Sequence, residues 1–148
     1  MRYEEQKLLI KDLCARLPYG VMVDVLVPYG EDMHRVEKLI GITNLTSYEM
    51  GWSFEMAYTN ELGMESRTTI YADNEEEIPK PYLRPMLSMT EEEFDELERV
   101  PSNIIYTDGT LVTNGKDADW LNSRHYDYRG LISKGLANIA PKGMYNTK

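Results

Sequence analysis

Cysteine is almost absent from this chain, since Cys14 is the only one in 148 residues. A single cysteine cannot form an intramolecular disulfide, and it cannot build a cysteine-rich zinc site. The only two histidines, His34 and His125, fall in separate predicted elements, so we expect no metal site. The chain is therefore expected to depend on an ordinary hydrophobic core and to work in the cytosol, a reducing compartment.

Long apolar runs and an excess of positive charge are also missing. No stretch approaches the ~20 apolar residues that a membrane helix needs, and the first twenty residues carry charges throughout. Neither a membrane span nor a signal peptide is expected. The 16 Lys and Arg residues face 25 Asp and Glu residues, which gives a net charge of −9. This charge repels nucleic-acid phosphates and suits a basic protein partner.

Motifs for phosphate binding and for nucleophilic catalysis are missing as well. The glycines form neither a GxxxxGK[ST] nor a GxGxxG pattern, so no nucleotide or other cofactor is expected. No GxSxG elbow surrounds any serine, which leaves a Ser-His-Asp triad without support. These absences favour a protein that is not an enzyme.

Hydrophobic periodicity over the first half predicts a helix followed by strands. Residues 3–17 place leucines at helical spacing with charged residues between them. Apolar and polar residues then alternate in short runs separated by polar connections. The runs are residues 21–27, 34–43, 51–58 and 64–72. Short connections predict an antiparallel four-strand meander, because parallel strands need long crossovers.

The second half begins with a segment that we call the strap, residues 78–85, whose three prolines predict an extended conformation. Thr90 and Glu93 then form a capping box that predicts a middle helix. Phe94 and Leu97 of this helix are expected to face inward.

Asp108-Gly109 predicts a C-terminal β-hairpin over residues 103–113, and a third helix is expected from Lys116, continuing into residues 129–137. The complete prediction is an α+β fold in a single domain, residues 1–148. It consists of the four-strand antiparallel meander, the C-terminal hairpin, and N-terminal, middle and C-terminal helices.

Residues with acid, base and anion-binding chemistry gather in "RHYDYR", residues 124–129. His125 next to Asp127 is the candidate catalytic pair, because a carboxylate raises the pKa of an imidazole that acts as a base. Arg84 or Arg129 would then hold an anionic substrate, since guanidinium groups bind phosphate and carboxylate bidentately. The sequence supplies no other part of a catalytic site.

The alternative for the same segment is structural, and we favour it. Tyr126 and Tyr128 would bury their rings, while Asp127 or His125 would cap a short helix beginning near Arg129. The strap leaves two interpretations open as well. Tyr82 and Arg84 on a stiff segment could form a recognition surface or could only pack.

Two blocks, "KPYLRPMLSMTEEE" (80–93) and "DWLNSRHYDYRGLISKGLANIAPKGMYN" (119–146), carry a resemblance. They resemble a protein family found across the genomes, prophages and mobile elements of gut Bacteroidetes. The resemblance implies a gene carried by phage or mobile DNA in a bacterial host cell, and it brings no activity and no catalytic residue. This chain departs from the family pattern at Leu87, where serine is common, at Arg124, where histidine is common, and at Ile139, where an acid is common.

The strap and the second block, which we call the tail (residues 119–146), are expected to pack together. The apolar residues Pro81, Leu83 and Pro85 and the ring of Tyr82 would contact Trp120, Tyr126 and Leu131. A groove would then form beside Arg84, Asp127 and Arg129.

The function that the sequence favours is a non-enzymatic binding or adaptor protein, encoded by phage or mobile DNA and acting on another protein. The candidate binding residues lie at the seam of strap and tail and are Tyr82, Arg84, Tyr126, Tyr128 and Arg129. One alternative is a small hydrolase or transferase that uses His125 and Asp127. Another is an acidic mimic of nucleic acid, with the carboxylates of residues 73–77 and 91–98 on one face.

Overall fold

The computed structural model describes residues 3–27, 33–44, 52–59, 62–72, 78–100, 105–107, 110–112 and 116–145. The chain divides into two compact units, residues 1–81 and residues 82–148. The single domain stays a prediction. Among the described residues, no helix is long and apolar enough to cross a membrane.

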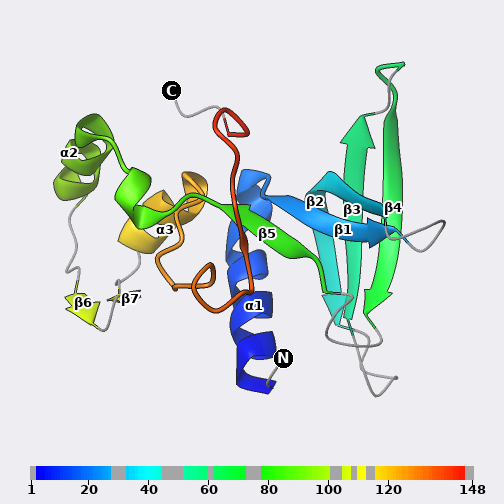
Figure 1. Ribbon diagram of the computed structural model, residues 1–148, viewed down its shortest axis with the longest axis horizontal. Helices are drawn as coiled ribbons and strands as arrows, with labels where there is room; N and C mark the ends of the chain where they lie inside the picture. Colours follow the sequence, from blue (N-terminus) through cyan, green and yellow to red (C-terminus); the bar gives the residue numbers. More distant parts are fainter. Residues whose placement is uncertain are drawn as a thin grey trace. The chain divides into compact units, whose positions relative to one another are not determined.

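The first unit contains the helix and the meander that the periodicity predicts (Figure 1). Each strand pairs antiparallel with the next, so the predicted four-strand meander is confirmed. The elements are α1 (Tyr3–Arg16), the 3-10 turn η1 (Leu17–Tyr19), β1 (Met22–Val27), β2 (Met33–Asn44), β3 (Trp52–Thr59) and β4 (Glu65–Ala72).

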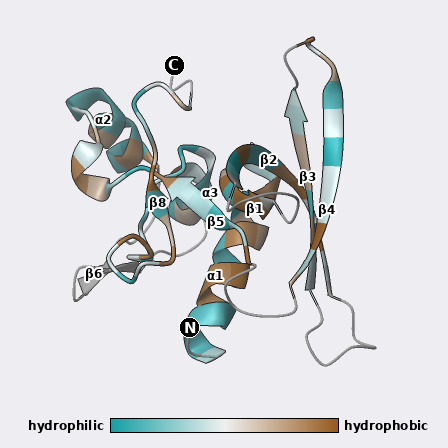
Figure 2. Ribbon diagram, turned by 45° about the vertical axis from the view of Figure 1, so that its right-hand side comes forward, coloured by the Kyte–Doolittle hydropathy of each residue, from teal (hydrophilic) through white to brown (hydrophobic). Residues whose placement is uncertain are grey.

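The core of this unit forms on one face of the sheet. Buried side chains alternate along the strands with exposed ones, as period-two patterning requires. In Figure 2, α1 is hydrophilic at its first turn and hydrophobic further along, and both views place it beside β1. The large apolar residues buried here are Leu9, Ile10, Leu13, Val21, Val23, Val25, Leu39, Phe54 and Met56.

The sheet is larger than the predicted one, and it is mixed. Its strand order is β4-β3-β2-β1-β5-β8, where β5 is Lys80–Leu83 of the strap and β8 is Asn138–Ile139. β5 pairs antiparallel with β1 and parallel with β8. Proline patterning concealed β5, because Pro81 has no N–H to donate to a ladder. Each of the two pairings of β5 accordingly spans only two residues.

The second unit holds the 3-10 turn η3 (Met86–Ser88), α2 (Glu91–Arg99) and α3 (Lys116–Ser123). The predicted C-terminal hairpin is present as β6 (Ile105–Thr107) and β7 (Thr110–Val112), although its Asp108-Gly109 turn lies outside the described residues. The three predicted helices are confirmed. The predicted continuation of the third helix into residues 129–137 is wrong, because turns follow α3 there.

Helix α2 begins as its capping box predicts. The Thr90 hydroxyl oxygen accepts a hydrogen bond from the Glu93 N–H at 3.1 Å. Leu97 is buried as expected, but Phe94 is 53% exposed, so its predicted inward direction is wrong. Glu93 occupies the inward position instead, because a guanidinium partner compensates its burial.

Candidate functional site

Strap and tail are joined through the backbone of Arg84, as their predicted packing requires. Arg84 and Tyr126 form an isolated parallel β-bridge. The Arg84 N–H donates to the His125 carbonyl at 2.7 Å, and the Asp127 N–H donates to the Arg84 carbonyl at 2.9 Å. Further along, the Ala140 N–H donates to the Leu83 carbonyl at 2.8 Å. The residues singled out in the strap therefore lie directly beside those singled out in the tail.

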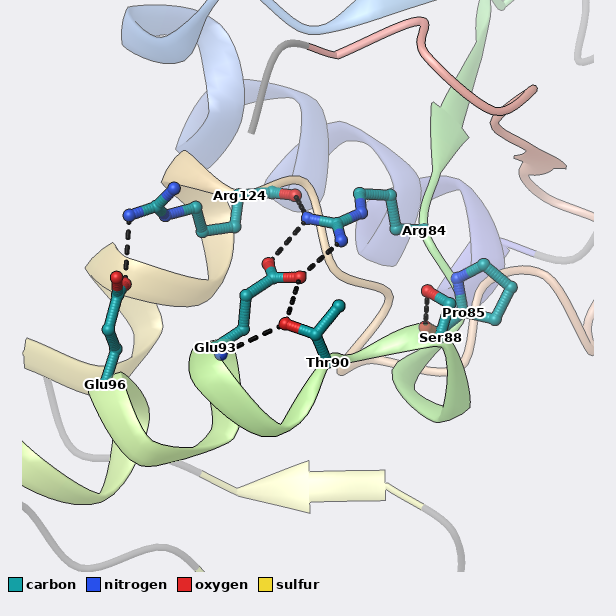
Figure 3. A network of polar contacts seen from close by, with 7 residues as sticks. All are labelled: Arg84, Pro85, Ser88, Thr90, Glu93, Glu96 and Arg124. Atoms are coloured by element: carbon teal, nitrogen blue, oxygen red, sulfur yellow. Dashed lines mark hydrogen bonds and ion pairs between the residues drawn. The ribbon is translucent and has the colours of Figure 1, made fainter. Parts of the chain in front are cut away.

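The Arg84 side chain is held on several sides (Figure 3). Its Nη1 and Nη2 donate to the two carboxylate oxygens of Glu93 at 2.9 and 2.8 Å, a bidentate geometry. Nη1 also lies 3.4 Å from the Arg124 carbonyl oxygen, and the guanidinium stacks 4.2 Å from the centre of the Tyr126 ring. Arg84 thus already binds a carboxylate, one supplied by its own chain.

Glu93 is buried yet remains charged. Burial by itself would raise its pKa, but hydrogen bonds from Arg84 and Tyr126, supported by the positive charge of Arg84 and by the Thr90 hydroxyl, lower the pKa to about 2. Thr90 contributes twice, because its hydroxyl donates to Glu93 Oε1 at 3.2 Å while it caps the helix. A second ion pair lies nearby, between Arg124 Nη2 and Glu96 Oε2 at 3.0 Å (Figure 3). Strap, α2 and tail are fixed together by these contacts.

His125 terminates α3. The Tyr126 N–H donates to the Leu121 carbonyl at 3.0 Å and the His125 N–H donates to the Asn122 carbonyl at 3.1 Å. These two bonds form a Schellman motif, in which the residue after the helix cap adopts a left-handed conformation. His125 has a φ of 61° and is the sole described non-glycine residue with positive φ. Helix termination therefore accounts for its backbone conformation.

The imidazole of His125 is also used for packing. It is buried, and its ring stacks on Tyr145 with 3.8 Å between the ring centres. A general base must be reachable by substrate in a concave site with further polar groups converging on it. The position of His125 does not meet this requirement.

Asp127 caps the turn that follows it. Its Oδ1 accepts a hydrogen bond from the Leu131 N–H at 2.7 Å, and its Oδ2 accepts one from the Ile132 N–H at 2.9 Å. Both carboxylate oxygens are therefore occupied by backbone donors. Capping by Asp127 was predicted, although it stabilises a series of turns rather than a helix beginning near Arg129.

The two tyrosines are buried, as the structural interpretation predicts. Tyr126 has no exposed surface and packs with Leu97, Leu121 and Tyr128 in one hydrophobic cluster. Its ring also stacks on Trp120, with 6.0 Å between the centres. Burial raises the pKa of Tyr126, and the neighbouring Glu93 carboxylate adds to this rise.

The remaining candidate binding residues are Tyr128, Arg129 and Tyr82. The Tyr128 hydroxyl donates to Asn122 Oδ1 at 3.0 Å, and the half-buried Arg129 lies over the Tyr128 ring at 4.5 Å. Tyr82 is half-buried, and its carbonyl accepts a hydrogen bond from the Tyr145 hydroxyl at 2.6 Å. Of the five candidate binding residues, only Tyr82, Arg84 and Arg129 retain side-chain surface for a partner.

Another histidine and carboxylate meet in the first unit, and sequence reasoning did not connect them. His34 Nδ1 lies 2.9 Å from Asp24 Oδ1, and the imidazole is largely exposed. Both side chains lie on the sheet face opposite the buried valines of β1. The predicted β1–β2 hairpin contained the necessary signal, since its register brings the two residues onto neighbouring strands.

Within the described ranges, no group of three or more His, Cys, Asp or Glu residues could hold a metal ion. No family model, no curated protein and no solved structure matches the chain. Its function is therefore inferred from its own residues.

Proposed function

We propose that the chain is a non-enzymatic protein-binding module carried by phage or mobile DNA, and that it binds a basic segment of another protein through α2 and the preceding turn η3. The acidic net charge and the resemblance of strap and tail support this class of function. The geometry of His125 and Asp127 speaks against the hydrolase or transferase alternative, since helix termination and capping account for both residues.

One observation carries the proposed location. Leu87 on η3 is 100% exposed, and the Phe94 ring on α2 is half-exposed. Covering a large exposed apolar side chain with a partner is favourable, because it removes apolar surface from water. Aromatic residues are frequent anchors of protein interfaces. Exposed apolar side chains close together in sequence therefore favour an interface over a purely solvated helix.

The charges around Phe94 indicate the chemistry of the partner. Glu91 and Glu98 stand three residues before and four residues after Phe94, so they are its neighbours on the helix surface. Together with Glu92 and Asp95 they are exposed. An aromatic anchor among carboxylates favours an apolar side chain flanked by Lys or Arg on the partner.

The nucleic-acid mimic is a second candidate that uses the same helix. It requires the carboxylates of residues 73–77 and 91–98 to form one stripe. The acids at 73–77 lie outside the described residues, and exposed Leu87 and Phe94 have no role in mimicking a phosphate backbone. Protein binding is the better-supported proposal for this reason.

A pull-down from a lysate of gut Bacteroidetes cells tests the proposal with Phe94→Ser, which removes the exposed ring. Leu62→Ser is the control, because Leu62 is also a large, exposed apolar residue but lies in the first unit. We expect one protein with a basic segment to be retained by the wild type and by Leu62→Ser, and to be lost by Phe94→Ser. Its retention should weaken as salt is raised, because exposed charges are screened.

Two results would contradict the proposal. A partner that Phe94→Ser still retains, but that a variant of Arg129 loses, would move the interface to the seam of strap and tail. Turnover of a substrate that disappears with His125→Ala, while the fold is kept, would establish the enzyme alternative.

A further inference from the structure

Strand β4 forms one edge of the sheet. It is the terminal strand in the order β4-β3-β2-β1-β5-β8, and Figure 1 shows it at the outer side of the meander. All eight residues from Glu65 to Ala72 pair with β3 without a break in register. No described strand pairs with the opposite side of β4. A regular strand of this length presents a row of backbone donors and acceptors along that side.

Most of the usual protection of an exposed strand edge is missing from β4. Edge strands are commonly protected by charged side chains, above all lysine, by proline or by a β-bulge, and β4 has only Glu65 and Arg67 of these. The sequence of β4, ESRTTIYA, has no proline and no lysine, and its pairing contains no bulge. In this sheet, β2 has a bulge between Leu39 and Gly41, and β5 contains Pro81.

The side chains of β4 suit pairing with an identical strand. The chain carries a net charge of −9, which opposes self-association, but the charges of β4 cancel because Glu65 is accompanied by Arg67. Thr68, Thr69 and Ile70 are β-branched and favour cross-strand packing. At the two ends of the strand, Met64 and Tyr71 are each 61% exposed. In an antiparallel pair, the beginning of one strand lies beside the end of the other.

We propose that two copies of the chain associate through β4, antiparallel and in a register centred on Thr68. A two-fold axis perpendicular to the sheet requires residues that face each other to lie on the same side of the sheet. Because sides alternate along a strand, the numbers of two facing residues must then be both odd or both even, and their sum is even. The Thr68 centre places Met64 opposite Ala72 of the second copy and Glu65 opposite Tyr71. It also places Arg67 opposite Thr69 of the second copy, and no like charges face each other. The two sheets become continuous.

Charge substitutions at Thr69 test both the interface and its register. Thr69 is exposed, but in its own chain it lies opposite Glu55 of β3, so a carboxylate at position 69 also meets a like charge within the monomer. Thermal melts of each variant separate this intramolecular effect from association. Thr69→Lys puts lysine opposite Arg67 of the second copy, twice, and should weaken the dimer at least about fivefold. Thr69→Glu puts a carboxylate in the same two places and should tighten the dimer by about fivefold. Thr43→Lys is the control, because Thr43 is exposed on β2, an inner strand.

Sedimentation equilibrium over a range of protein concentrations is the measurement. We expect the wild type and Thr43→Lys to approach twice the monomer mass of 17.2 kDa. The Thr69→Lys variant should need at least about fivefold more protein than the wild type to reach the same average mass. A wild type that remains monomeric overturns the proposal. A dimer that responds equally to Thr69→Lys and Thr69→Glu overturns the register, and a dimer that responds to neither overturns the assignment to β4. Circular dichroism of each variant verifies that the sheet has formed.

Discussion

The segment 124–129 is more buried, and helix α2 more exposed, than the chemistry of their residues suggests. The first contains histidine, aspartate, arginine and tyrosine, yet His125 and Tyr126 are buried and serve the fold. The second is an acidic helix of ordinary composition, yet it exposes a phenylalanine. Reaction or recognition requires access to the surface, so the exposure of a residue is better evidence for a functional role than its chemical type.

Two buried carboxylates of the second unit make a similar contrast. Glu93 is bound by Arg84, and its pKa falls to about 2. Asp117, in the first turn of α3, is fully buried, and neither of its carboxylate oxygens has a hydrogen-bond partner among the described residues. Burial raises the pKa of Asp117. Both carboxyl groups are buried, so the presence or absence of a charged partner decides whether the pKa falls or rises.

The largest effect on stability is expected from removing the aromatic centre of the joint between strap and tail. Tyr126→Ala should lower the free energy of unfolding by ~3 kcal/mol, because it leaves a cavity in the cluster with Leu97 and Leu121 and removes the ring under Arg84. Urea unfolding followed by circular dichroism measures the loss. Tyr3→Ala is the control, since an exposed tyrosine outside β4 should change stability by less than ~0.5 kcal/mol. Equal stability of the two variants would show that segment 124–129 is a surface rather than a joint.

A smaller loss is expected when the ion pair is broken. Glu93→Gln leaves the mostly buried Arg84 guanidinium without its carboxylate, which should cost ~2 kcal/mol at neutral pH. Because the pKa of Glu93 is lowered on folding, its contribution is complete above the ordinary value of 4.5 and is lost as the pH falls towards about 2. Urea unfolding at several pH values should therefore show the two proteins converging in acid. Exposed Glu92→Gln should follow the wild type, and a constant difference for Glu93→Gln would refute the ion-pair explanation.

How far the sequence predicts these features depends on the distance over which each interaction acts. The capping of α2 by Thr90 and the meander were predictable, because neighbouring residues and short connections determine them. The contacts of Arg84 with Glu93 and Tyr126 join residues 9 and 42 positions away, and no local pattern reports such pairing. The strand in the strap was concealed by its prolines.

The exposure of Phe94 illustrates a different limit. Glu93 and Phe94 are adjacent in the sequence, and hydrophobicity favoured the phenylalanine for the interior. The distant Arg84 reverses this choice because it binds Glu93 there. The helix-terminating role of His125 escaped prediction because glycine is the usual signal of a left-handed residue at a helix end, and position 125 is a histidine.

The most direct test of the structural role of segment 124–129 is urea unfolding of His125→Gly against His125→Ala. Both variants lose the stacking on Tyr145, but only glycine adopts a φ of 61° without strain. We predict that His125→Gly is more stable than His125→Ala by ~1 kcal/mol, and that His125→Ala is less stable than the wild type. Equal unfolding free energies for the wild type and both variants would contradict the account, because they would mean that His125 neither terminates α3 nor packs in the joint.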